Sequence, residues 1–138
     1  MDLDDSISGS PQDWLRHARS NLLRAKQAKP TGVLWEHLCF DAQQAAEKAI
    51  KAVLVLHGIA FPKTHDLRDL LTLWKQSGHE VPPDLWKVIR LSRYAVEARY
   101  PGDEEPVAED EHHDAVAMAD LAVHWAEHLV SPQRDPPP

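Results

Sequence analysis

The strongest indication of architecture lies in FDAQQAAEKAIKAVLVL, residues 40–56. The first half of this stretch is amphipathic, with alanines recurring at helical spacing, whereas residues 50–56 are apolar on every side except at Lys51. A helix that is apolar nearly all round is covered by its neighbours. We therefore expect this helix, which runs from about Val33 to His57, to be the central element of a helical bundle.

Four further helices are predicted around this central one, each from apolar residues at helical spacing between proline or glycine stops. They run from Pro11 to before Pro30, from a Thr64 or Asp66 cap to Gly78, from Pro83 to Arg99, and from about Glu109 to Val130. No strand pattern is visible. The predicted fold class is all-α, an up-and-down antiparallel bundle of four longer helices and one short helix. It should occupy residues 10–131, between a flexible N-terminus at 1–9 and a disordered, proline-rich tail at 132–138.

Composition and charge restrict the classes of function. The chain has 138 residues, of which 43% are hydrophobic, which suits one domain with a core of its own. Its net charge of −7 argues against nonspecific binding to a polyanion. However, residues 63–99 hold seven basic and five acidic residues, a net of +2, whereas residues 101–138 hold one and ten, a net of −9. A local anionic ligand near the fourth helix is therefore allowed.

The sequence favours a cytoplasmic location. Its acidic start lacks the basic and apolar regions of a signal peptide, and the apolar run at residues 52–56 is too short to cross a bilayer. Cys39 is the single cysteine and cannot form an intramolecular disulfide. We expect it to be a small, buried hydrophobic residue.

Three separated phrases resemble one known family when they are taken together. They are the helix at residues 40–52, the turn KTHDL at 63–67, and ARYPG at 98–102. In this order they are similar to the HEPN family (higher eukaryotes and prokaryotes nucleotide-binding domain), over about residues 11–130. The resemblance implies a homodimer and, as partner, a minimal nucleotidyltransferase in a toxin-antitoxin-like or stress module.

The family members that cleave RNA resemble one another in an arginine followed, after four to six residues, by a histidine. An imidazole can move protons at the 2′-hydroxyl and the leaving group, while a guanidinium stabilises the charged phosphorane without a metal. No arginine of this chain has a histidine at those positions. We therefore expect a noncatalytic binding module, with no catalytic residue and no cofactor. The alternative is a metal-independent endoribonuclease toxin without the usual motif.

The resemblance also implies a ligand site where the Thr-His-Asp turn meets the end of the fourth helix. Arginine side chains there could bind a phosphate and tyrosine rings could stack on a base, so a nucleotide or RNA is the candidate ligand. The alternative is structural, with the aspartate capping a helix and the tyrosines packing. The candidate ligand-binding residues are His65, Asp66, Arg93, Tyr94, Arg99 and Tyr100.

Two histidine clusters could suggest metal chemistry. Residues 124–128, HWAEH, match His-x-x-Glu-His, in which both histidines share one helix face. That face is the polar one and no strong third ligand follows, so we expect no metal site beyond adventitious binding of nickel or zinc. His112 and His113 are interpreted as part of a solvated, acidic helix start.

A polar ribbon runs along the central helix through Gln43, Gln44, Glu47 and Lys48. Glu47 and Lys51 are four residues apart and can form an ion pair. A ligand or a subunit could contact this ribbon, but we expect it to be a solvated face.

Overall fold

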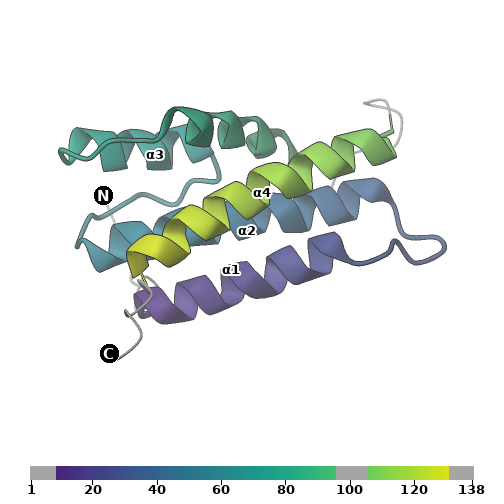
Figure 1. Cartoon of the computed structure of the whole chain (residues 1–138), viewed down its shortest axis with the longest axis horizontal. Coiled ribbons are helices and arrows are strands. Elements are labelled where there is room, and N and C mark those ends of the chain that lie inside the picture. The colour runs from purple at the N-terminus through teal and green to yellow at the C-terminus, as the bar shows by residue number, and fades with distance from the viewer. Residues whose placement is uncertain (1–8, 96–105, 131–138) are drawn as a thin grey trace, which may run out of the picture.

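The computed structural model describes residues 9–95 and 106–130 of the chain. These residues form helices α1 (Pro11–Lys26), α2 (Trp35–Leu56), α3 (Leu67–Gln76) and α4 (Glu109–Val130), together with the 3₁₀ helix η2 (Pro83–Tyr94). No strand occurs in the described ranges. The all-α prediction of four longer helices and a short one is confirmed (Figure 1).

Helix α2 is the central element, as predicted. It packs against each of the other four helices. Figure 1 shows α1 on one side of α2 and the layer of α3 and η2 on the other, while α4 crosses in front. Many buried residues of α2 are alanines, whose small side chains let neighbouring backbones approach closely. Its fully buried alanines are Ala42, Ala45, Ala46, Ala49 and Ala52.

The start of α1 is fixed by local chemistry that the sequence predicts. Ser10 is the N-cap, and its hydroxyl accepts a hydrogen bond of 3.0 Å from the backbone N–H of Asp13. Pro11 occupies the first helical position, where its missing N–H leaves no helical bond unmade. Capping of this kind contributes about 1 kcal/mol to helix stability.

The fourth helix differs from the predicted α-helix, because its described part is a 3₁₀ helix. Its buried residues recur at every third position. A 3₁₀ helix has three residues per turn and therefore places this set on one line, which an α-helix of 3.6 residues per turn would not do. The set is Leu85, Val88, Leu91 and Tyr94. The predicted continuation of this helix to Arg99 lies outside the described residues.

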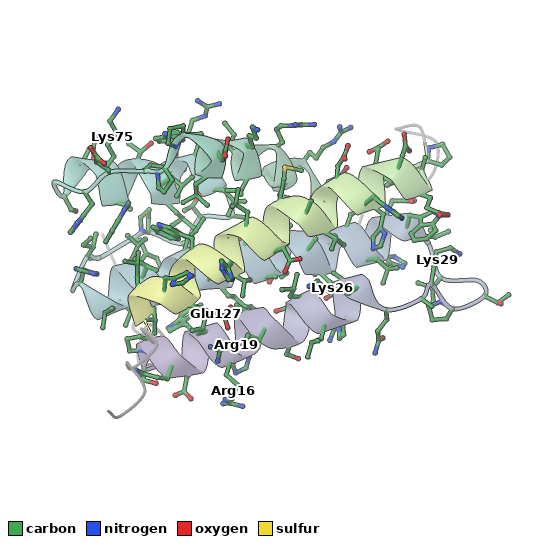
Figure 2. The ribbon with its side chains drawn as sticks, in the orientation of Figure 1. Arg16, Arg19, Lys26, Lys29, Lys75 and Glu127 are labelled. Atoms are coloured by element: carbon green, nitrogen blue, oxygen red, sulfur yellow. The ribbon has the colours of Figure 1, made fainter. Side chains whose placement is uncertain are left out.

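Helices α1 and α4 are joined by two exposed ion pairs. Arg19 Nε lies 2.7 Å from a Glu127 carboxylate oxygen, and Lys26 Nζ lies 2.9 Å from Asp120 (Figure 2). Such exposed pairs contribute little to stability, typically about 0–1 kcal/mol. The attachment of α4 therefore rests mainly on its buried apolar residues, four of which are alanines.

His112, near the start of α4, and Cys39 on α2 both lie deep in the bundle. His112 is buried, and its Nε2 lies 2.6 Å from the carbonyl oxygen of Ala25, so the prediction of a solvated His112 is wrong. The partner of His112 is a backbone carbonyl near the end of α1. The spacing of apolar residues in α4 could not indicate this contact with another helix. Cys39 is buried as expected. Burial raises the pKa of its thiol to about 12, with Glu111 and Glu36 acting in the same direction.

Among the described residues, none of the helices combines the length and the apolar character needed to cross a bilayer. The hydrophobic faces instead meet in one core between the helices.

Candidate functional site

A stripe of polar side chains lies inside the bundle on α2. Gln43 is fully buried, and Glu47 and Lys51 keep only 4% and 8% of their surface exposed. Their four-residue spacing puts all three on one helix face, which is covered by the connection that carries Phe61 and His65. The prediction of a solvated face is therefore wrong for Gln43 and Glu47. A connection that folds back over a helix leaves no trace in that helix's own periodicity.

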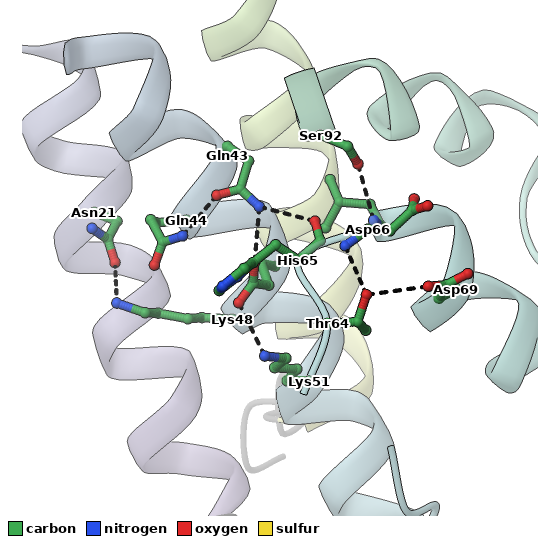
Figure 3. Close-up of polar contacts among 12 residues, drawn as sticks. Asn21, Gln43, Gln44, Lys48, Lys51, Thr64, His65, Asp66, Asp69 and Ser92 are labelled. Atoms are coloured by element: carbon green, nitrogen blue, oxygen red, sulfur yellow. Dashed lines mark hydrogen bonds and ion pairs between the residues drawn. The ribbon is translucent and has the colours of Figure 1, made fainter. Parts of the chain in front are cut away.

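The carboxylate of Glu47 is the centre of this arrangement. Figure 3 shows the side chains of its partners Gln43, Lys51 and His65. It accepts hydrogen bonds from Gln43 Nε2 at 2.8 Å, from Lys51 Nζ at 3.0 Å and from His65 Nδ1 at 2.9 Å. Burial by itself would raise the pKa of Glu47, but the charge of Lys51 and the three hydrogen bonds outweigh it and lower the pKa. Glu47 is thus ionised at neutral pH, although it is buried.

The positive charge of Lys51 is balanced by Glu47, and two aromatic rings cover its ammonium group. Its ammonium group pairs with Glu47 and lies 5.8 Å from the centre of the Trp14 ring and 5.4 Å from that of Phe61. Ring faces attract a cation, and more strongly when water is excluded. The ammonium group therefore holds α1, α2 and the connection after α2 together.

His65 differs from the other members because its side chain is 67% exposed. A carboxylate can only accept, so Nδ1 donates to Glu47 and the neutral ring keeps its lone pair on Nε2. The backbone is also fixed, because Gln43 Nε2 donates to the His65 carbonyl oxygen at 3.4 Å. The result is an exposed imidazole in a set orientation, with one nitrogen available to a ligand or a proton.

The rest of the Thr-His-Asp turn serves the fold. Asp66 is the N-cap of α3, and its carboxylate accepts from the backbone N–H of Arg68 at 2.9 Å. The Thr64 hydroxyl accepts from the Asp66 N–H at 3.0 Å, and the Ser92 hydroxyl accepts from the Leu67 N–H at 3.0 Å. These bonds hold the turn between α2 and η2 and so keep His65 in place.

Arg93 and Tyr94 line a different, small pocket of about 70 Å³ on the side of α4. The Tyr94 hydroxyl donates to a Glu111 carboxylate oxygen at 2.8 Å, and the Arg93 guanidinium lies 5.5 Å from the Tyr94 ring centre. Burial and this hydrogen bond raise the pKa of Tyr94. The Tyr94 ring is buried in packing, as the structural alternative expects. Arg99 and Tyr100 lie outside the described residues.

A second group of charges adjoins the Glu47 arrangement on the side of α1. Arg24 makes two hydrogen bonds to Asp41, at 2.6 Å and 3.2 Å. Asn21 donates to Asp41 at 3.1 Å and accepts from Lys48 Nζ at 2.8 Å. Burial lowers the pKa of Lys48, although Glu47 raises it. Sequence reasoning missed these links, because they join residues about 20 positions apart on two helices.

Beside Lys48 lies a hollow of about 240 Å³ at the start of α1. Its lining is mostly apolar and includes the Trp14 side chain, whose buried Nε1 has no hydrogen-bond partner among the described residues. The other lining residues are Gly9, Asp13 and His17.

Taken together, α2 and the turn before α3 form what we call the Glu47 cluster, which comprises Gln43, Glu47, Lys51 and His65. Its chemistry suits the binding of a polar or anionic group, or the transfer of a proton at His65 Nε2. Only His65 of this set is among the six predicted ligand-binding residues. The spacing of residues 43, 47 and 51 was the available indication of the other three.

The chain was compared with known proteins and structures. A model of the HEPN domain matches residues 11–129. ST0689, described as an archaeal HEPN homologue, has a crystal structure that matches with a TM-score of 0.69 at 26% identity, covering 89% of this chain and 99% of that one. No curated protein matches. Because the family model spans nearly the whole chain and the bundle is shared, the chain belongs to the HEPN domain family.

Proposed function

We propose that this HEPN protein is a noncatalytic binding module. It forms a homodimer, pairs with a minimal nucleotidyltransferase in a toxin-antitoxin-like or stress module, and binds a nucleotide through His65. The observation that carries the ligand part is the exposed imidazole of His65, which the buried carboxylate of Glu47 holds by its Nδ1. Burying the charged carboxylate of Glu47 costs desolvation free energy. A surface histidine that binds no ligand would not need such a support.

The charges around Glu47 support an anionic ligand. Two ammonium groups, those of Lys48 and Lys51, lie beside the single carboxylate of Glu47, which gives two minus one, or +1. A protonated His65 would add a further positive charge at the surface. A phosphate group is the anion that suits such donors, because it accepts several charge-assisted hydrogen bonds. We also assign Arg99 to this ligand site, on the basis of the family resemblance.

Calorimetric titration with ATP, GTP and a short single-stranded RNA tests the ligand. We expect saturable binding by the wild type and a roughly tenfold to hundredfold loss in His65→Ala and in Arg99→Ala, because the first removes an imidazole whose Nε2 donates when the ring is protonated and the second removes a guanidinium donor. His113→Ala is the matched control, since its side chain is 73% exposed and lies on α4. Equal binding by the wild type and His65→Ala would contradict the ligand site.

The partner is tested separately. A small nucleotidyltransferase encoded beside this chain should co-purify with it in a fixed ratio when the two are expressed together. Size-exclusion chromatography with light scattering gives the ratio. If the two proteins elute apart at micromolar concentration, the partner proposal fails and the ligand proposal stands by itself.

The second candidate function is a metal-independent endoribonuclease. The hydrogen bond from His65 to Glu47 favours it, because a carboxylate that fixes Nδ1–H leaves Nε2 as a proton acceptor. Against it, the sequence lacks the arginine and histidine spacing of the RNA-cleaving members. Incubation of labelled single-stranded RNA with the protein in EDTA decides the matter. Cleavage by the wild type that is lost in His65→Ala would replace the noncatalytic proposal.

A further inference from the structure

Two histidines form a close pair on the exposed face of α4, away from the Glu47 cluster. His124 and His128 are one helical turn apart, and both side chains are exposed. Their Nε2 atoms lie 3.2 Å apart, with ring centres 4.7 Å apart and ring planes at 83°. The two nitrogens therefore lie close enough together for one ion to contact both.

The distance between the two Nε2 atoms suits a pair of ligands that bind the same metal ion. With metal–nitrogen bonds of about 2.0–2.1 Å, two nitrogens 3.2 Å apart subtend an angle of about 103° at the ion. This value lies between the roughly 90° of a square-planar and the roughly 109° of a tetrahedral arrangement. A rigid helix thus presents both ligands at the required spacing before any ion binds, so little ordering has to accompany binding.

We propose that His124 and His128 form a two-ligand site for a divalent transition-metal ion. By the usual order of affinities for nitrogen ligands, Cu²⁺ should bind most tightly, followed by Ni²⁺ and Zn²⁺. No group of three or more histidine, cysteine or acidic residues that could hold a metal occurs among residues 9–95 and 106–130. Within these residues the remaining coordination positions are left to water or to a donor from another molecule.

The neighbouring charges leave the imidazoles as the available donors. Asp120 is paired with Lys26 and Glu127 with Arg19, both from α1, so each carboxylate already has a counter-ion. In the apo pair, one Nε2–H must donate to the other Nε2. Chelation needs both lone pairs, so that proton moves to Nδ1 of its own ring. Protons and the ion compete for the same nitrogens, and affinity falls as the pH is lowered.

Calorimetry with CuCl₂ and ZnCl₂ on the untagged chain, at neutral pH and in a weakly coordinating buffer, tests the site. We expect one Cu²⁺ per chain, weaker binding of Zn²⁺, and an electron paramagnetic resonance spectrum with two nitrogen ligands. His124→Ala and His128→Ala should each weaken Cu²⁺ binding roughly a hundredfold, because the second imidazole acts at high effective concentration.

His113→Ala on the same helix removes one exposed histidine and should leave Cu²⁺ binding unchanged. Circular dichroism of each variant checks that α4 is intact. If His124→Ala and His128→Ala bind Cu²⁺ as tightly as the wild type, or if His113→Ala loses the ion, the assignment is overturned.

Discussion

At the scale of single residues, Glu47 is the side chain on which the local arrangement depends. Its carboxylate lies in the bundle because three donors surround it, and each donor is in turn positioned by that bond. The sequence predicts the ion pair with Lys51 from the four-residue spacing. It could not predict the bond from His65, which is 18 residues away and meets Glu47 only when the connection folds back.

The first prediction at this scale concerns the charge of Glu47. In Glu47→Gln the buried ammonium group of Lys51 loses its counter-ion, and breaking a buried pair in this way costs about 3–5 kcal/mol. Urea denaturation followed by circular dichroism measures the free energy of unfolding. Glu109→Gln neutralises an exposed carboxylate of α4 and should change stability by less than about 0.5 kcal/mol. Equal stability of the two variants would show that the buried pair is not stabilising.

The second prediction follows from the lowered pKa of Glu47. At a pH between the folded and the unfolded pKa of Glu47, the unfolded chain binds more protons than the folded one, so lowering the pH favours unfolding. The stabilisation is complete above the unfolded value of about 4.3 and is lost as the pH falls through the folded pKa. Urea denaturation from pH 7 to pH 3 should show a steeper loss in the wild type than in Glu47→Gln. Parallel curves would contradict a lowered pKa.

At the scale of secondary-structure elements, the sequence predicts best where the reason is local. The start of α1 follows from Ser10 and Pro11, and the burial of α2 follows from its apolar residues. The 3₁₀ geometry of η2 was missed, although the apolar spacing of three residues from Leu85 to Tyr94 is visible in the sequence. An α-helix is the commoner outcome for such a segment, and the packing of η2 against α2, α3 and α4 is not visible in its own sequence.

The third prediction tests the burial of α2. Ala49→Asp or Leu54→Asp should abolish soluble expression, because each places a carboxylate at a fully buried position without a partner. The cost of several kcal/mol is comparable with the whole stability of a domain, about 5–15 kcal/mol. As the control, His124→Ala combined with His128→Ala changes only the exposed face of α4 and should leave folding intact. Soluble, folded Leu54→Asp would show that α2 is not central.

At the scale of the whole molecule, the bundle follows from the sequence, whereas its assembly does not. The helices cover residues 50–54 within one chain, so the buried centre alone does not demand a second copy. The proposed site was only partly predictable for a related reason. Arg93 and Tyr94 are close to the Thr-His-Asp turn along η2, but the turn of that helix sends them toward α4 and away from Glu47.

The fourth prediction concerns assembly. We expect a helical circular dichroism spectrum and a symmetric homodimer, the latter from the pairing that is common in the family. Sedimentation equilibrium at micromolar concentrations should give twice the chain mass of 15.6 kDa. A single species of 15.6 kDa over the whole range would remove the dimer from the proposed function and would leave the fold unaffected.

The 3₁₀ geometry of η2 has a consequence for how the length of this chain can vary. With a rise of about 2.0 Å per residue, 12 residues span about 24 Å, against about 18 Å for the same segment as an α-helix. Inserting or deleting one residue after Val88 would rotate every later residue of the helix by about a third of a turn and move the Tyr94 ring out of the core. Relatives that keep this helix should therefore differ in its length by multiples of three residues.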